Sequence, residues 1–222
     1  MKIYALLPMK GNSERVPNKN LKSFCGAPLY QKVLDTLLAS DFIDSVIINT
    51  DSERIKEDVL ANYSERVIIH DRPDDIKGDF VSMNRVIEYD IDKKDADYYI
   101  QTHSTNPLLK TTTVDEAIRK MIKRKEEYDS IFSVTRMQTR LYGCDGKPLN
   151  HDPVKLLRTQ DLPPIYEENS NLYIFSKESF KNSGGKRIGT KPLMFEIDKI
   201  EAIDIDELHD FIIAESLYKA LQ

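Results

Sequence analysis

The segment after the first apolar run is suited to binding a polyphosphate. Residues 7–20, here called the phosphate loop, combine small residues with cations. The small residues, which allow tight turns with exposed backbone N–H groups, are Gly11, Asn12 and Ser13. The cations, which fall within ten positions of an acidic chain, are Lys10, Arg15 and Lys19. Backbone donors beside cations predict a triphosphate site, although the loop is neither a Walker P-loop nor a Rossmann glycine motif.

A second candidate site lies near the C-terminus. Asp204 and Asp206 are two residues apart on a segment predicted to be extended, so both side chains face the same side. Two carboxylates with free oxygens are what a magnesium ion bridging substrate phosphates needs. The alternative is that Asp206 only caps the helix predicted after it. Together with the phosphate loop, the pair predicts a metal site.

Alternating strands and helices must hold both groups of residues. Short apolar runs bounded by turn residues predict strands at 3–7, 46–49, 67–70, 98–102 and 130–134. Helical patterns between them cover 28–40, 53–61, 82–90 and 113–124. This order predicts an α/β fold with a doubly wound, mostly parallel sheet. Ligands bind such sheets at the carboxyl ends of the strands, where the phosphate loop leaves the first strand.

Residues 136–160 break this rhythm with glycines, prolines and scattered apolar residues. We expect a loop-rich excursion, serving as a lid or a subunit contact, within one domain that spans 1–222. Beyond it the pattern predicts an extended segment, a short helix, a last strand and a last helix, at 165–175, 176–180, 202–205 and 207–221. In the last helix, the side chains expected to pack inward are Phe211, Ile212, Ala214 and Leu217.

Composition narrows the functional classes. The 222 residues are 40% hydrophobic and 31% charged, which is typical of a folded protein. The net charge of −5 argues against broad nucleic-acid binding, and no apolar run is long enough to cross a bilayer. No signal peptide is visible after Met1, and Cys25 and Cys144 lack the spacing of metal ligands. We therefore expect a cytoplasmic protein with reduced thiols and neither nucleic-acid nor membrane partners.

The phosphate loop resembles the signature of the acylneuraminate cytidylyltransferases, the CMP-sialic acid synthetases. That signature reads Ala-Arg-x-x-Ser-Lys-x-x-Pro-x-Lys-Asn, and the matching residues here are Ser13, Pro17, Lys19 and Asn20. Lys10 stands where the family has Arg, and Glu14 where it has Lys. A carboxylate cannot stabilise a leaving pyrophosphate, so we expect Arg15 to supply the charge that position 14 lacks.

The resemblance continues along nearly the whole chain and implies roles for further residues. Asn49 to Asp51 is similar to a family Ser-Thr-Asp, and His103 falls at the Gln of a Gln-Pro-Thr-Ser-Pro-Leu block. The implied nucleotide-binding residues are Gly11, Asn12, Ser13, Asn20, Arg72, Ser82 and His103. By residue type alone, Arg72 and Ser82 also fit surface positions, and His103 fits a structural histidine.

The sugar and metal sites are implied in the same way. Segments 158–164 and 168–173 resemble the blocks Arg-x-Gln-Asp-Leu-Pro and Asn-Gly-x-x-Tyr. The implied sugar-binding residues are Arg158, Gln160, Asn169 and Tyr173. Ser170 replaces the family Gly, which predicts a slightly different backbone there. Asp204 and Asp206 match the Asp-x-Asp that the family uses for its metal.

The resemblance implies a Rossmann-like nucleotidyltransferase fold and a complete reaction. The anomeric 2-hydroxyl of a nine-carbon 2-keto sugar acid attacks the α-phosphate of CTP with Mg²⁺, and pyrophosphate leaves. Lys10, Arg15 and Lys19 are the expected catalytic cations, and no side chain stands out as a general base. Family homodimers imply that segment 136–160 lies across the partner's sugar pocket. The alternatives are a nucleotidyltransferase acting on Kdo or a sugar 1-phosphate, and a catalytically silent nucleotide-binding protein.

Overall fold

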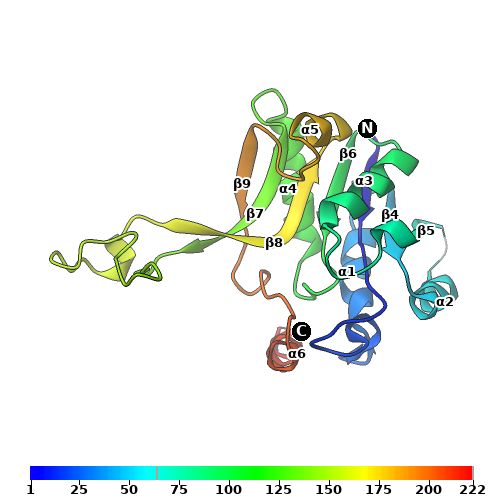
Figure 1. The fold of residues 1–222 in the computed structure, drawn as a ribbon, viewed down its shortest axis with the longest axis horizontal. Coiled ribbons are helices and arrows are strands. Elements are labelled where there is room, and N and C mark those ends of the chain that lie inside the picture. Colours follow the sequence, from blue (N-terminus) through cyan, green and yellow to red (C-terminus); the bar gives the residue numbers. More distant parts are fainter. Residues whose placement is uncertain (64, 222) are drawn as a thin grey trace.

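A seven-stranded sheet forms the centre of the molecule (Figure 1). The computed structural model describes residues 1–63 and 65–221. The strands are β1 (Ile3–Leu6), β4 (Ser45–Thr50), β5 (Val67–Asp71), β6 (Tyr98–Thr102), β7 (Ser130–Met137), β8 (Ile165–Phe175) and β9 (Pro192–Glu196). Their order is β5-β4-β1-β6-β8-β7-β9, and only β8 runs antiparallel to its neighbours. The prediction of a mostly parallel sheet is confirmed.

Helices cover both faces of this sheet. They are α1 (Leu29–Leu38), α2 (Glu53–Asn62), α3 (Met83–Lys93), α4 (Thr111–Lys123) and α5 (Lys177–Asn182). A sixth helix, α6 (Leu208–Ala220), packs against Phe24 and Leu29 in a separate apolar cluster. One apolar cluster joins the sheet to α1, α2 and α4, and a second cluster, around Tyr99 and Phe175, joins it to α3 and α5. Burial of these faces from water is the main force that holds the layers together. The doubly wound arrangement is therefore also confirmed.

Local signals in the sequence explain where several helices begin. The hydroxyl of Ser52 accepts from Ile55 N at the start of α2, and that of Ser82 accepts from Asn84 N at the start of α3. Ser176 and Ser179 form a reciprocal capping box on α5. Each of these contacts satisfies a backbone N–H group that the helix leaves without a partner. The predicted helices match the observed ones to within a few residues at their ends.

A small hairpin precedes α1. It consists of β2 (Ser23–Phe24) and β3 (Ala27–Pro28), joined by Cys25 and Gly26. Both turn residues have positive φ, 49° and 86°. A two-residue turn of this kind fits the right-handed twist of the strands, and glycine adopts the left-handed conformation without steric cost.

The C-terminal segment differs from its prediction in two ways. Residues 202–205 form no strand, because the edge position beside β7 is taken by β9, which precedes them. A backbone hydrogen bond from Ile205 N to Thr105 O holds this loop against the end of β6 instead. In α6, Phe211 and Ala214 are buried as predicted, whereas Ile212 is 59% exposed. Position 212 lies one residue, about 100° of helix rotation, from the buried face.

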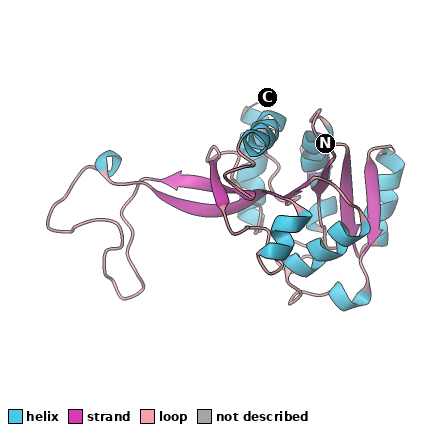
Figure 2. Ribbon diagram, turned by 90° about the horizontal axis from the view of Figure 1, so that it is seen from above, coloured by secondary structure: helices cyan, strands magenta, loops and turns pink. Residues whose placement is uncertain are grey.

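Strands β7 and β8 extend beyond the sheet as a two-stranded arm (Figures 1 and 2). The arm pairs Thr135 with Glu167 and Met137 with Ile165, and residues 138–164 form its tip. The tip is loops apart from a 3-10 turn, η3 (Thr159–Asp161), and a bridge between Tyr142 and Pro148. The predicted excursion 136–160 thus begins within β7. Val154 and Leu156 at the tip are 92% and 75% exposed, so they are largely uncovered by the described part of the chain.

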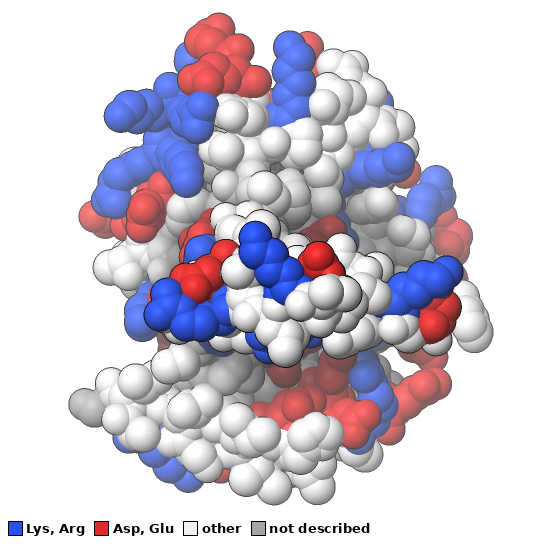
Figure 3. All heavy atoms as spheres, turned by 90° about the vertical axis from the view of Figure 1, so that its left-hand side faces the viewer, with Lys and Arg blue, Asp and Glu red and all other residues white. Residues whose placement is uncertain are grey.

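The surface that carries the arm mixes charges of both signs. Figure 3 shows Lys and Arg side chains interspersed with Asp and Glu over this face. Across the described ranges 1–63 and 65–221, no helix has the length and apolar character that a membrane crossing requires.

Candidate active site

The phosphate loop is anchored to β4 at its first residues. Leu7 N and Met9 N donate to Ile47 O and Asn49 O, at 2.8 and 2.9 Å. Gly11 N then donates to the carboxylate of Asp51 at 2.8 Å. A Cβ atom at Gly11 would lie 2.7 Å from Ser52 Cβ, so only glycine allows this approach. The amide of Gly11 is therefore engaged within the protein, and the glycine serves to seat the loop.

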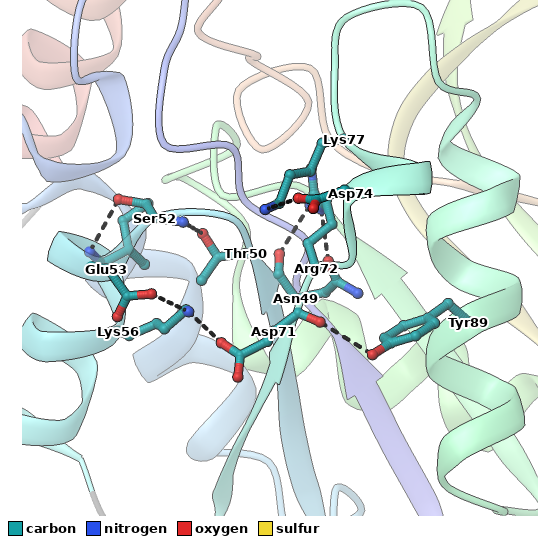
Figure 4. Close-up of polar contacts among 11 residues, drawn as sticks. Asn49, Thr50, Ser52, Glu53, Lys56, Asp71, Arg72, Asp74, Lys77 and Tyr89 are labelled. Carbon is teal, nitrogen blue, oxygen red and sulfur yellow. Dashed lines mark hydrogen bonds and ion pairs between the residues drawn. The ribbon is translucent and has the colours of Figure 1, made fainter.

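Arg72 strengthens the same attachment of the phosphate loop to β4 through Asn49 (Figure 4). It is 4% exposed, and its guanidinium donates to Asn49 Oδ1 at 2.7 Å and Asn49 O at 3.0 Å. Asn49 in turn donates to Asp90 at 2.8 Å, and the ring of His70 contacts the same carboxylate oxygen at 2.7 Å. Burial lowers the pKa of Arg72, and the charges of Asp51 and Asp90 oppose that shift. Arg72 is thus part of a buried network beneath the loop.

A cavity of about 510 Å³ opens above this network at the carboxyl ends of β1 and β6. The predicted site residues that line it are Lys10, Asn12, Ser13, Arg15, Lys19, Asn20, His103, Asp204 and Asp206. The structure therefore brings together the phosphate loop and the two C-terminal carboxylates, which are nearly two hundred residues apart in sequence. The predicted residues outside this lining are Gly11, Arg72, Ser82, Arg158, Gln160, Asn169 and Tyr173.

The loop cations are held by carboxylates that the solvent reaches. Lys10 Nζ lies 2.9 Å from Asp79, and Arg15 Nη2 lies 2.7 Å from Asp206. Exposed ion pairs of this kind contribute only about 0–1 kcal/mol, so a triphosphate can displace them. Asp79 has no motif around it, and the sequence analysis did not identify it. Glu14 also lines the cavity, so the carboxylate that departs from the family signature faces the site.

Lys19 and Asn20 connect the loop to neighbouring segments. Lys19 Nζ donates to Ile205 O at 2.6 Å and lies 3.8 Å from Asp206. Burial lowers the pKa of Lys19, while nearby Asp204 and Asp206 oppose the shift. Asn20 donates to Lys10 O at 2.9 Å and accepts from the Ser104 hydroxyl at 2.7 Å. Both side chains therefore hold the loop in place as well as lining the cavity.

The two C-terminal carboxylates differ in their surroundings. Asp206 is paired with Arg15, whereas Asp204 forms no ion pair with any residue described in the structure. Burial and the charge of Asp206 raise the pKa of Asp204, and a hydrogen bond from Thr105 opposes the shift. A cation at the pair would relieve this repulsion. The alternative role of Asp206 as a helix cap does not hold, because Glu207 and Asp210 form the capping box of α6.

These carboxylates suit a magnesium ion that takes its remaining ligands from elsewhere. Over residues 1–63 and 65–221, no group of three or more acidic, His or Cys side chains is placed to hold a metal alone. Mg²⁺ in nucleotide enzymes is commonly bound by one or two carboxylates together with substrate phosphates and water. The donor set at Asp204 and Asp206 therefore fits that ion.

A second group of residues, here called the strand wall, is built on β6 and β8 and consists of Gln101, His103, Tyr173 and Arg187. Arg187 Nη1 donates to Gln101 Oε1, and its guanidinium lies 4.1 Å from the centre of the Tyr173 ring. His103 and Arg187 reach the cavity. Sequence reasoning missed Arg187, which follows α5 in a loop without any motif.

His103 is electrically neutral in this environment. Burial, together with the charges of Arg187 and Lys19, lowers its pKa to about 4. Its Nε2 lies 3.4 Å from Gln101 Nε2, an amide donor, so this ring nitrogen acts as the acceptor and Nδ1 carries the proton. The side chain is therefore a hydrogen-bonding group rather than a cation at neutral pH.

The predicted sugar residues fall in three places. Tyr173 is buried, and its hydroxyl donates to Glu168 and shares a second hydrogen bond with the Ser170 hydroxyl. Asn169 bonds to Ser133 and Thr135 and lines a second cavity of about 490 Å³, which shares Ser170 and Asp204 with the first. Ser170 has φ of 56°, a left-handed conformation that glycine adopts without steric cost.

Besides Gly11, Arg72 and Tyr173, three further predicted residues line neither of these cavities. Arg158 forms a two-point contact with Asp161, at 2.7 and 3.1 Å, on the arm. Gln160, also on the arm, accepts a hydrogen bond at its backbone carbonyl from Gln138 at 2.6 Å. Neither residue lines either cavity. Ser82 caps α3, and its neighbour Met83 is the residue that reaches the first cavity.

Comparison with known proteins shows the family to which the chain belongs. The profile of the family described as "Cytidylyltransferase" matches residues 4–217. "N-acylneuraminate cytidylyltransferase A" of Danio rerio is 28% identical over 96% of this chain, which spans about half of that protein's length (50%). "Pseudaminic acid cytidylyltransferase" of Campylobacter jejuni is 24% identical, over 99% of this chain and 97% of the relative.

A solved structure shares the whole fold. The structure of CMP:2-keto-3-deoxy-manno-octonic acid synthetase complexed with CTP superposes with a TM-score of 0.73 at 15% identity, covering 100% of both chains. At this identity the likeness shows the fold alone. The family profile covers nearly all of the chain. These matches confirm the resemblance of the chain's motifs to those of the acylneuraminate cytidylyltransferases. The chain therefore belongs to the cytidylyltransferase family of nucleotidyltransferases.

Proposed function

We propose that this protein transfers CMP from CTP to the anomeric 2-hydroxyl of a nonulosonic acid, a nine-carbon 2-keto sugar acid, and releases pyrophosphate. The observation that carries the proposal is the single cavity that unites the three loop cations with Asp204 and Asp206. Relatives whose names specify N-acylneuraminate and pseudaminic acid support the acceptor class. Both named acceptors are acidic nine-carbon sugars.

The reaction requires charge neutralisation and alignment more than it requires covalent chemistry by the protein. The anomeric oxygen forms a bond to the α-phosphorus, the bond from that phosphorus to the bridging oxygen breaks, and the hydroxyl proton is lost. Lys10, Arg15 and Lys19 exchange their carboxylate partners for phosphate oxygens and stabilise the negative charge that develops on pyrophosphate. We assign no general base.

Asp204 and Asp206 would hold Mg²⁺ beside the phosphates. When bound there, the ion supplies neutralisation of phosphate charge. For Asp206 this requires the contact with Arg15 to open, which frees Arg15 for the triphosphate. The chain's own part is to place both carboxylates at the cavity beside the loop, and the Ile205–Thr105 hydrogen bond fixes the segment that carries them.

Asn20 remains our proposed direct nucleoside contact, and we propose that Ser82 and Arg72, which line neither cavity, support nucleoside binding indirectly. Asn20 lines the cavity directly. The buried guanidinium of Arg72 acts through Asn49 and the Met9 carbonyl, to which it donates at 3.4 Å. Ser82 orders the start of α3, whose Met83 faces the cavity. Gly11 contributes by seating the loop.

We further propose a homodimer in which the arm of one subunit lies across the cavity of the other. The exposed apolar side chains of the arm tip, including Val154 and Leu156, support an interface there. Arg158 and Gln160, which are remote from the cavity of their own chain, would then meet the acidic sugar of the partner. Light scattering during turnover tests the dimer, and a fully active monomer would refute it.

The free thiols of Cys25 and Cys144 fit a cytoplasmic location.

The activity is tested by measuring pyrophosphate release with each of the four nucleoside triphosphates and a panel of sugar acids. The panel should hold several nonulosonic acids, the eight-carbon acid Kdo, and a sugar 1-phosphate. We expect turnover with CTP and at least one nonulosonic acid. Turnover confined to Kdo or to a sugar 1-phosphate would overturn the acceptor class, and CTP binding without turnover on any acceptor would indicate a silent nucleotide-binding protein.

A further inference from the structure

Arg187 is a cation at the cavity that lacks an anionic partner. Lys10, Arg15 and Lys19 each lie near a carboxylate, whereas Arg187 forms no ion pair within residues 1–63 and 65–221. Its guanidinium has five N–H donors, and only the contact to Gln101 Oε1 uses one of them. Burial lowers its pKa, and the charge of nearby Glu168 opposes the shift without closing an ion pair. A largely desolvated charge of this kind is stabilised by an anion that enters the cavity.

The guanidinium is oriented before any ligand arrives. It lies 4.1 Å from the centre of the Tyr173 ring, and its bond to Gln101 fixes it from a second direction. Tyr173 is itself held by hydrogen bonds from its hydroxyl to Glu168 and Ser170. A fixed planar guanidinium suits the two oxygens of a carboxylate, because both N–H···O bonds then form in one plane.

The position of Arg187 separates it from the triphosphate site. The phosphate loop follows β1, while Arg187 lies over Tyr173 on β8, and β6 stands between these strands. Because Arg187 also donates to Gln101 on β6, its distance from β1 corresponds to between one and two strand spacings, about 5–10 Å. The cavity lining includes Arg187 together with His103 and Ser170, so a ligand that fills the cavity meets the phosphate loop on one side and Arg187 on the other.

We infer that Arg187 binds the carboxylate of the acceptor sugar acid and is the residue that selects an acid over a neutral sugar. This inference rests on the proposed function. In a 2-keto acid the carboxylate and the anomeric hydroxyl are attached to the same carbon atom. Anchoring the carboxylate on the strand wall therefore limits where the attacking oxygen can lie. Neutral His103, beside Arg187, adds a hydrogen-bonding group without adding a second charge.

The test compares Arg187→Gln with the unaltered protein on two acceptors, the nonulosonic acid that supports turnover and its C1 carboxamide. We expect kcat/KM for the acid to fall about 10- to 100-fold, the range for losing a charge-assisted hydrogen bond. The carboxamide, which carries no charge, should lose little. The preference of the unaltered protein for acid over amide should therefore nearly disappear, and Arg187→Lys should restore part of it.

CTP provides the internal control for folding and for site assignment. Calorimetric CTP affinity of Arg187→Gln should stay within about twofold of the unaltered value, since the triphosphate contacts are on the loop. Arg85→Gln, which alters an exposed arginine of α3 paired with Glu88, is the matched control. It should leave both acceptor and CTP constants unchanged.

Four results would overturn the inference. Weaker CTP binding with an unchanged acid KM would assign Arg187 to the triphosphate. Equal losses for acid and carboxamide would show that the side chain only supports Gln101 and Tyr173. Unchanged kinetics for Arg187→Gln on an acid that the unaltered protein uses would refute only the role assigned to Arg187. An unaltered protein that is inactive on every acid would refute the proposed function and, with it, this inference.

Discussion

On the phosphate loop, Lys10 and Arg15 face carboxylates that water reaches, whereas on the strand wall the partly buried Arg187 faces an amide and an aromatic ring. The loop cations can change partners at little cost, because exposed ion pairs are weak. Arg187 has no carboxylate to leave and is oriented in advance. The difference suggests that the protein adjusts its loop around the nucleotide and keeps a rigid surface for the acceptor.

Among substitutions on the loop side of the cavity, removal of the Asp204 carboxylate, which has no cation partner among the described residues, should lower turnover most. Asp204→Asn takes away one anionic ligand at nearly constant volume, and we expect turnover at saturating CTP to fall by about 100-fold or more. Turnover is measured across a magnesium titration, with the exposed Asp41→Asn as the matched control. Near-normal turnover of Asp204→Asn at limiting magnesium would show that the metal is bound elsewhere.

Loss of a loop cation should weaken the binding of CTP more than the binding of the acceptor. Lys19→Ala removes a charge-assisted contact to the triphosphate and also the bond to Ile205 O, so we expect KM for CTP to rise about 10- to 30-fold. KM for the acid should change much less. Steady-state kinetics with each substrate varied in turn checks this division. A larger effect on the acid would contradict the contrast between the two sides of the cavity.

The lowered pKa of His103, on the strand wall, predicts how the stability of the protein depends on pH. The pKa of His103, about 4, lies below the ordinary value of 6.5, so between these values the folded protein binds fewer protons than the unfolded chain. Its contribution to stability is therefore complete above about pH 6.5 and is lost as pH falls toward 4, by about 1–3 kcal/mol. His103→Gln should lose less stability over this range in denaturant titrations at each pH. Parallel losses in both proteins would show that His103 titrates normally.

The smallest effect is expected at Glu14. Glu14→Lys replaces a carboxylate that lines the cavity with the family's lysine, so CTP affinity should improve about two- to fivefold. Calorimetric titration with CTP measures the change, and Glu57→Lys on the exposed side of α2 serves as the control. Strong inactivation by Glu14→Lys would mean that the carboxylate has acquired a role of its own.

Most of the fold was predictable because local signals agree with it. Buried runs such as Ser45–Thr50 have the length and composition of parallel strands, and Ser52 and Ser176 mark the helix starts that they cap. The strand expected at 202–205 was wrong because an apolar run near the end of the chain does not reveal which segment takes the sheet edge. That choice depends on β9 pairing with β7, a contact between segments that are distant in sequence.

Residue types and spacing by themselves determined the phosphate loop, the Asp204–Asp206 pair and the α/β class, because glycine turns, clustered cations and alternating carboxylates have short-range signatures. Only the tertiary structure decided what these residues contact: Arg72 lies beneath the loop, Asp206 pairs with Arg15, and Arg187 stands over Tyr173. Arg187 could not be found from the sequence, since its role depends on burial and on the absence of a nearby carboxylate. Those properties arise from packing between chain segments that no local pattern specifies.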